Sequence, residues 1–313
     1  MNARLLAALL AVSTLSQAAH AQVPGKAPVP VVPGIPLDAE QAAKGAPAPP
    51  PPPPPANQTP LPSDAQCAPL PPVKLPLAFG PGETLEYDVD AMGAKAARMI
   101  MRTLPLKDGA LPIEIDVATN TFFSKVRRVK GAGTSYVSPR TLKPQRYFED
   151  ATENEVHRVA DVRFRPKDHV AHLMSNIDGT TYEQDLGHVN DALDVSGTIY
   201  YLRQMPLKAG QAMCFDAYGI RRMWRVWGKV VGREHVSLPV GEFEAWHIAG
   251  EAARLDLPAM RREIHVWISD DPRRLPLAAL GSIDLGTVRA TLTGITRPGE
   301  KQTEAETRAN LKW

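Results

Sequence analysis

The sequence predicts an all-β domain: a single antiparallel, strongly curved sheet or an open barrel with one short helix, preceded by a disordered proline-rich tail. From Leu77 onward, short segments alternate apolar and polar residues, which is typical of strands with one buried face. Turn residues separate these segments at close intervals, as in antiparallel sheets. A single segment instead repeats its apolar residues with helical spacing.

Residues 1–21 have the features of a secretory signal peptide. An apolar run from Leu5 to Leu15 follows a basic residue, and a small-residue triplet comes next, so we expect cleavage between Ala21 and Gln22. The run is too short to span a bilayer comfortably, and no later segment reaches about 18 uninterrupted apolar residues. The leader predicts an exported chain that is peripheral to a membrane at most; an uncleaved N-terminal anchor is the alternative.

Residues 22–72 are rich in proline and alanine, with an unbroken proline run from Pro49 to Pro55. Proline has no backbone N–H, and the stretch has few large apolar side chains, so it cannot build a core. We expect a disordered, extended tail in the polyproline II conformation. The alternative is a ligand for a proline-binding groove.

Residues 73–297 form the predicted β-domain, and residues 298–313 form a polar C-terminal tail. In the first strand, Leu85, Tyr87 and Val89 alternate with acidic residues, as a half-buried strand requires. Strands are expected over residues 84–90, 95–104, 111–119, 135–139, 144–150, 155–166, 170–176, 180–186, 223–239, 243–253, 262–270, 275–283 and 286–295.

One helix is expected in this domain, after Asp191. Val195, Ile199 and Leu202 lie on one face of a helix, which should pack against the sheet. Either Asp191 or Asp194 can accept the hydrogen bonds of an N-cap.

The charge balance excludes a polyanion as the expected partner. Lys and Arg number 36 and Asp and Glu number 34, a formal net charge of +2. Nucleic-acid binders usually have a strong basic excess with interleaved aromatic residues. Residues 219–229 approach that pattern, but their alternation favours a two-faced strand. We therefore expect no nucleic-acid partner.

Two cysteines, Cys67 and Cys214, occur in this exported chain. In an oxidising compartment they most simply form one disulfide, which would tie the end of the tail to the folded domain. Two separate thiols are the alternative, because the sequence does not show whether the two Cα atoms approach within about 7 Å.

No metal or cofactor site is expected. His169 and His172 alone have a ligand-like spacing, and on a strand their side chains would point to opposite faces. No Cys, Asp or Glu at a supporting spacing completes a site. His247 and His265, which stand beside tryptophans, are interpreted as ordinary surface or rim residues.

Motifs that carry known catalytic chemistry are absent: there is no G-x-S-x-G elbow, no Gly-rich phosphate loop after a strand and no H-E-x-x-H. Ser196 falls inside the expected helix and is interpreted as a packing residue. Glu153 and Glu155 lie in a polar turn and are interpreted as solvated. No catalytic residue is assigned, and we expect a protein that is not an enzyme.

Four charged residues flank Pro272 in the segment from Asp270 to Arg274. The segment falls between two expected strands, and Asp271 followed by proline favours a type I turn. We interpret the charges as an exposed turn, whose ion pairs contribute only about 0 to 1 kcal/mol, rather than as an active site.

The chain is rich in flexible or broad apolar side chains. Thioethers and indole rings can line an adaptable cavity for acyl chains, although an ordinary core is the favoured interpretation. The residues concerned are Met99, Met101, Met174, Met205, Met213, Met223, Met260, Trp224, Trp227, Trp246 and Trp267.

Several loose motifs become specific through their order and spacing. They are FGPGETLEYDV (79–89), MGAKAA (92–97), TFFSKVRRV (121–129), SPRTLKPQRYFED (138–150), DALDVSGTIYYLRQMPLKAGQ (191–211), LPVGEFEAWHI (238–248) and VWISDDPRRLPLAALGSIDLGTVRATL (266–292). Through them, the chain from about Leu77 to Ile295 resembles the bacterial family called domain of unknown function 3108.

The resemblance implies a periplasmic envelope protein of a Gram-negative bacterium. It also implies a fold similar to the curved, open β-barrels of periplasmic lipoprotein-handling proteins, and it assigns no catalytic residues. The chain departs from plainer members in its long proline-rich tail and at Cys214, and this departure favours the pairing with Cys67. Because the charged turn recurs as a landmark of the family, the resemblance also implies, as the alternative to a plain turn, an envelope partner that touches Arg273 and Arg274.

These expectations favour an exported, non-enzymatic protein that binds a hydrophobic ligand, a lipoprotein segment or another envelope component and supports envelope integrity. The expected partners are a lipid, a lipoprotein or an envelope protein. A structural or scaffolding protein that reaches its partner through the proline-rich tail is the alternative, and a hydrolase is a third, less favoured one.

Overall fold

The computed structural model describes residues 60–67, 69–189, 191–283 and 286–299. Its elements are η1 (Asp64–Gln66), β1 (Thr84–Ala91), β2 (Ala94–Thr103), β3 (Leu111–Thr119), η2 (Phe123–Lys125), β4 (Val129–Val137), β5 (Pro144–Glu153), β6 (Val156–Arg165), β7 (Val170–Ile177), β8 (Thr180–Gly187), β9 (Ala192–Asp194), α3 (Val195–Gln204), β10 (Ala212–Gly219), β11 (Arg222–Leu238), β12 (Gly241–Arg254), β13 (Arg261–Ser269), β14 (Pro276–Ile283) and β15 (Gly286–Thr296).

The strands of the described residues form one 15-stranded sheet, in the order β8-β7-β6-β5-β4-β3-β2-β1-β15-β14-β13-β12-β11-β10-β9. Neighbouring strands are antiparallel, except that β9 pairs with β10 in parallel. The sheet is open, because the strand order ends at β8 on one side and at β9 on the other. The predicted single, strongly curved sheet with one helix is confirmed.

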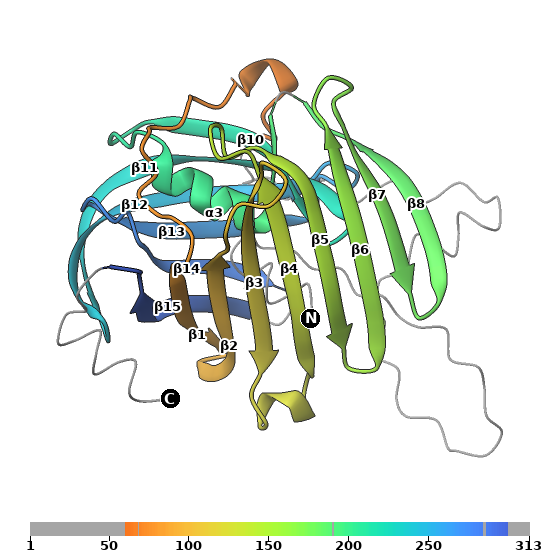
Figure 1. Cartoon of the computed structure of the whole chain (residues 1–313), viewed down its shortest axis with the longest axis horizontal. Coiled ribbons are helices and arrows are strands. Elements are labelled where there is room, and N and C mark those ends of the chain that lie inside the picture. The colour runs from red at the N-terminus through yellow and green to blue at the C-terminus, as the bar shows by residue number, and fades with distance from the viewer. Residues whose placement is uncertain (1–59, 68, 190, 284–285, 300–313) are drawn as a thin grey trace.

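The sheet bends so that its two halves enclose the helix. In Figure 1, β3 to β8 stand upright at the front, β10 to β14 run across behind them, and α3 lies between the two sets. The halves join where β1 pairs with β15, with Leu85 opposite Ile295. The core therefore lies on the concave side, around α3.

The core is formed by the apolar residues of the strands that were predicted from alternating apolar and polar residues. Leu85, Tyr87 and Val89 of β1 are buried, and Met99 and Met101 of the neighbouring β2 are fully buried beside them. Each large apolar side chain removed from water in this way contributes about 1.5 to 3 kcal/mol. The methionines here are ordinary core residues, as expected.

Three parts of the sheet lie outside the expected strand ranges: β9, β10 and the start of β4. β9 has three residues, too few for an alternation to be visible. The start of β4 contains Gly131 and Gly133, which have low strand propensity. A side chain at Gly133 would collide with the hydroxyl group of Tyr147, so the glycine is required by packing that sequence periodicity does not reveal.

The helix α3 begins as predicted. Asp194 is its N-cap, and its carboxylate accepts a hydrogen bond from the backbone N–H of Gly197 at 2.7 Å. The Ser135 hydroxyl group donates to the same carboxylate, which ties the helix to β4. Every residue of α3 is buried, including the polar ones, because the helix is covered on more than the sheet side.

Asp194→Asn is expected to change the pH dependence of stability. Burial raises the pKa of Asp194 from 3.8 to about 6, against the opposing effect of the hydrogen bonds from Ser135 and Gly197. The folded protein binds this proton more tightly than the unfolded chain, so Asp194 lowers stability progressively as the pH rises through this window. The neutral amide should remove that loss, so its stability relative to wild type should rise by up to about 3 kcal/mol across the window.

Urea unfolding at pH values below and above the window measures this difference. The control is Asp194→Ala, which loses the cap and should be less stable at every pH by about 0.5 to 2 kcal/mol relative to the asparagine variant. Parallel pH profiles for wild type and Asp194→Asn would contradict the expectation.

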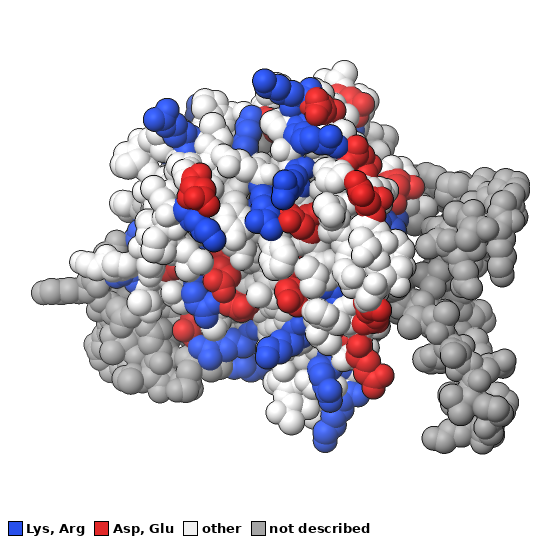
Figure 2. Space-filling view, turned by 45° about the vertical axis from the view of Figure 1, so that its right-hand side comes forward, with Lys and Arg blue, Asp and Glu red and all other residues white. Residues whose placement is uncertain are grey.

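The outer surface carries both signs of charge. Figure 2 shows Lys and Arg interspersed with Asp and Glu over the visible face, in keeping with the near-neutral composition. Among the described residues, no helix is both long enough and apolar enough to cross a membrane.

Candidate functional site

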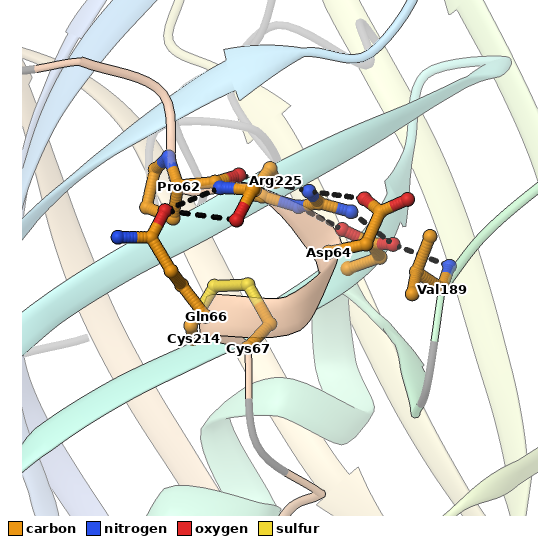
Figure 3. Close-up of a disulfide and its surroundings, with 9 residues drawn as sticks. Pro62, Asp64, Gln66, Cys67, Val189, Cys214 and Arg225 are labelled. Atoms are coloured by element: carbon orange, nitrogen blue, oxygen red, sulfur yellow. Dashed lines mark hydrogen bonds and ion pairs between the residues drawn. A yellow bond between two sulfur atoms is a disulfide. The ribbon is translucent and has the colours of Figure 1, made fainter.

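A strap formed by residues 60–67 and 69–79 runs over α3 to the start of β1 (Figure 1). Its first anchor is the disulfide between Cys67 and Cys214 of β10, whose Cα atoms are 4.8 Å apart. Figure 3 shows this bond beside η1. The two cysteines that the sequence singled out thus fix the strap to the sheet.

The second anchor of the strap is the buried guanidinium of Arg225 on β11. It donates to the Pro62 carbonyl oxygen at 2.9 Å and to the Asp64 carboxylate at 2.7 Å. On its other side it donates to Asp216 of β10 at 2.9 Å (Figure 3). Asp216 also accepts from the backbone N–H of Val189 at 2.7 Å. One buried cation therefore joins the strap to the sheet edge.

The third anchor is α3 itself. Tyr201 donates its hydroxyl hydrogen to the Pro71 carbonyl oxygen. The Gln204 side chain accepts from the backbone N–H of Ala78 at 2.8 Å and donates to the Lys74 carbonyl oxygen at 2.5 Å. These bonds occupy polar groups on the side of the helix away from the sheet.

The strap changes the predicted domain boundary. The proline-rich tail was expected to be disordered through residue 72, but residues 60–67 and 69–72 pack on the domain, and Leu70 is buried. The stretch lacks strand periodicity, because a strap is held by single long-range bonds rather than by a ladder. The earlier part of the tail, and the expected cleavage site between Ala21 and Gln22, lie outside the described residues.

An apolar cavity of about 30 Å³ lies between α3 and the concave face of β10 to β13. Its lining residues are Thr198, Ile199, Leu202, Met213, Phe215, Val226, Trp227, Gly228, Ile248, Ala249, Gly250, Ile264 and Val266. A site that holds one water needs roughly 10 to 15 Å³ by this measure, so the cavity admits a small apolar group but not a whole acyl chain. Met213, which lines the cavity, is half-buried and lies at its partly open edge.

Two glycines shape the floor of the cavity. Gly228 of β11 faces Gly250 of β12 across the ladder. A side chain at either position would collide with the backbone of the opposite strand, because each glycine lies against the carbonyl group next to the other. Close approach of the strands therefore requires glycine at both positions.

The helix α3 occupies the concave side and leaves the small apolar cavity beside β10 to β13. Of the methionines considered as an adaptable lining, Met213 alone borders the cavity. Met99 and Met101 are core residues, and Met174 is exposed. The methionines Met99 and Met101 therefore fill the core, and Met213 lies beside the cavity.

A network of polar and aromatic side chains lies on the outer face of β11 to β13. His247 hydrogen-bonds Glu234 at 2.7 Å and His265 at 2.8 Å, and Trp267 donates to Glu234 at 2.9 Å. His247 stacks on Trp267 with ring centroids 4.6 Å apart, and the hydrogen bond from Trp267 lowers the pKa of Glu234. The expected surface or rim position of His247 and His265 is confirmed. Their partner Glu234 lies on β11, and sequence spacing did not indicate this contact. His265 and Trp267 alternate with the buried core residues of β13, so this network points away from the cavity.

The remaining sequence candidates do not form a reactive site. His172 bonds Asp185 at 2.7 Å, whereas the ring of His169 lies beside that of His188. Ser196 is a fully buried helix residue. Within the described ranges, no three His, Cys, Asp or Glu side chains are placed to hold a metal ion.

The interpretation of Glu153 as solvated is wrong. Its carboxylate accepts a hydrogen bond at 2.8 Å from the guanidinium of Arg127, which is buried. The two residues lie on neighbouring segments that pair only after folding, so the local polar sequence concealed the ion pair.

The charged segment after β13 is a turn, but its four charged residues are half-buried rather than fully exposed. Asp271 accepts hydrogen bonds from the backbone N–H groups of Arg273 at 2.8 Å and Arg274 at 3.1 Å. The Arg274 guanidinium donates to the carbonyl oxygens of Arg203 at 3.0 Å and Met205 at 3.2 Å. The turn therefore satisfies carbonyl groups at the C-terminal end of α3, a contact between residues too far apart in sequence to be visible there.

The sequence profile of a family described as "Protein of unknown function (DUF3108)" matches residues 86–293. No curated protein matches the chain. Among solved structures, a β-barrel-like protein of domain of unknown function DUF1849 from Brucella abortus is 10% identical, with a TM-score of 0.49 over 70% of this chain and 98% of that chain. A candidate lipoprotein from Parabacteroides distasonis is also 10% identical, with a TM-score of 0.31 and the same coverage of 70% and 98%. The family expected from the motifs is confirmed.

Proposed function

Because this chain belongs to the DUF3108 family, we propose its function from the geometry of its interior: it is an exported, non-enzymatic protein that holds an apolar group of a lipid or lipoprotein beside α3. The observation that carries the proposal is the cavity between α3 and β10 to β13. Its lining is apolar almost throughout, and apolar lining with few polar groups is typical of ligand pockets.

The size of the cavity limits what it holds. It accommodates the end of an acyl chain or one apolar side chain, and the remainder of the ligand lies outside, past Met213. Shielding of one such group from water is worth about 1.5 kcal/mol or more, or about tenfold in affinity. This binding is modest and reversible, which suits carriage of an envelope lipid.

Met213→Trp tests the proposal. The indole ring should fill the open edge of the cavity and lower the affinity for dansyl-undecanoic acid by at least about tenfold, measured by fluorescence titration. The matched control is Met174→Trp, at an exposed position on β7, which should bind as the wild type does. Organic extraction of the purified wild-type protein followed by mass spectrometry should release a lipid.

Two results contradict the proposal: Met213→Trp binding the probe as tightly as the wild type, or an extract without lipid together with no binding of the probe. Equal unfolding midpoints of the two variants establish that a loss of binding reflects the cavity rather than the fold.

A scaffold function is the second candidate. It is favoured by the two anchors at Arg225 and Cys214, which fix the point at which the proline-rich segment meets the domain. Deletion of residues 22–59 spares both anchors. If the scaffold proposal is right, this deletion should abolish the function of the protein. If the lipid-binding proposal is right, the deletion should leave binding of the fatty-acid probe intact.

A further inference from the structure

The three most exposed large apolar side chains of the described residues lie at one end of the sheet. Phe122 is 70% exposed, Met92 is 65% exposed and Val126 is 63% exposed. Met92 is in the β1–β2 turn and the other two are in the β3–β4 connection, at the lower end of the molecule in Figure 1. We call these three residues the apolar rim.

The β3–β4 connection is bonded to the start of β2, next to the β1–β2 turn. The side chain of Asn120 donates to the Lys95 carbonyl oxygen at 2.6 Å, and its backbone N–H donates to the Ala96 carbonyl oxygen at 2.9 Å. These bonds hold the two rim connections at the same end of neighbouring strands.

The β3–β4 connection holds its apolar residues outward. Asn120 accepts from the backbone N–H of Phe123 at 2.8 Å, and the Phe123 ring is buried in the core. Buried Arg127 anchors the other end of the connection to Glu153 on β5. Between these anchors, Phe122 and Val126 face solvent, although the neighbouring Phe123 ring is buried in the core. The local hydrogen bonds therefore hold Phe122 and Val126 in their exposed positions.

The two rim connections are basic. Residues 92–95 and 120–128 contain no Asp or Glu, and they include exposed Lys95, Lys125 and Arg128. Acidic side chains lie beside them, because Lys95 forms an ion pair with Asp88 of β1 at 2.7 Å and buried Arg127 pairs with Glu153. The basic charge that the rim presents is therefore that of Lys125 and Arg128. An apolar tip with basic neighbours matches a surface that is both hydrophobic and anionic.

We propose that the apolar rim docks on a membrane that contains anionic phospholipid. Three protruding side chains with basic neighbours suit the headgroup and acyl boundary, where apolar side chains enter and cations remain among phosphates. A protein partner of ordinary interface size would need a broader, flatter apolar surface than these loop tips offer. The rim is separate from the cavity beside α3, so this inference does not depend on the proposed function.

Sedimentation with vesicles tests the docking. The full chain, exported and purified with its disulfide, is mixed with vesicles of phosphatidylcholine that contain about one third phosphatidylglycerol. Phe122→Ser/Val126→Ser should lower the affinity at least about tenfold, because it removes the inserted side chains. Lys125→Ser/Arg128→Ser should weaken binding to these vesicles and remove its dependence on salt.

The matched control is Leu106→Ser, because Leu106 is 60% exposed in the connection between β2 and β3, at the opposite end of the same strands. It should bind vesicles as the wild type does. The proposal fails if wild type does not sediment with the vesicles, if the rim variant binds unchanged, or if Leu106→Ser loses as much binding. All substituted side chains are exposed, so unchanged unfolding midpoints should accompany each variant.

Discussion

Loss of the disulfide between Cys67 and Cys214 is expected to lower the free energy of unfolding by about 2 to 5 kcal/mol. The two cysteines are separated by 147 residues, so the bond removes a large closure entropy from the unfolded chain. In the folded state it also keeps the strap on α3. Urea unfolding of the wild type with and without reductant measures the loss.

The control for this prediction is Cys67→Ser/Cys214→Ser, whose unfolding midpoint should equal that of the reduced wild type and should not respond to reductant. Limited proteolysis adds a local readout, since cleavage within residues 60–67 should become faster when the bond is absent. Equal midpoints of oxidised and reduced wild type would show that the bond contributes nothing to stability.

Arg203→Met should destabilise the protein by about 3 to 5 kcal/mol. The Arg203 side chain has no exposed area, and Glu83 is 1% exposed; two hydrogen bonds join them, at 2.5 Å and 3.0 Å. Arg203 also donates to the carbonyl oxygens of Arg273 and Arg274, so it joins α3 to the start of the sheet and to the charged turn. In Arg203→Met, the buried Glu83 carboxylate keeps fewer hydrogen bonds and less positive charge beside it.

Two further variants isolate the cause of that loss. Arg203→Met/Glu83→Gln should be less destabilised than the sum of its single variants, because the carboxylate is no longer left buried without its partner. Arg165→Met removes one member of an exposed pair with Asp185 and should cost at most about 1 kcal/mol. An Arg203→Met protein as stable as the Arg165→Met protein would refute the structural role of the buried pair. Urea unfolding provides all the values.

The sheet was predictable because strand burial is a local property. Leu111–Thr119 is β3 to the residue, since its alternating isoleucines and carboxylates leave one register that buries the apolar face. The helix was equally visible through the spacing of its apolar residues, and the structure selected Asp194 rather than Asp191 as its N-cap. The cysteines suggested their own pairing by number and compartment.

Contacts between distant segments were not predictable in the same way. The turn at Asp271 was correctly located, yet its burial against α3 depends on where the helix ends in space. The strap has no periodic pattern, and its bonds to Arg225, Tyr201 and Gln204 each join residues more than a hundred positions apart. The network of Glu234, His247 and His265 depends in the same way on the pairing of three strands.

By itself, the sequence determined the fold class, the helix, the family and the absence of known catalytic motifs, because alternation, helical spacing and motif order are properties of neighbouring residues. The tertiary structure alone decided that Asp194 caps α3, that α3 fills the concave side, that residues 60–67 and 69–79 cover it, and that a small apolar cavity and an exposed apolar rim remain. The physical reason is that burial within a strand follows from its own pattern, whereas a cavity or an exposed surface is what remains after all elements have packed together.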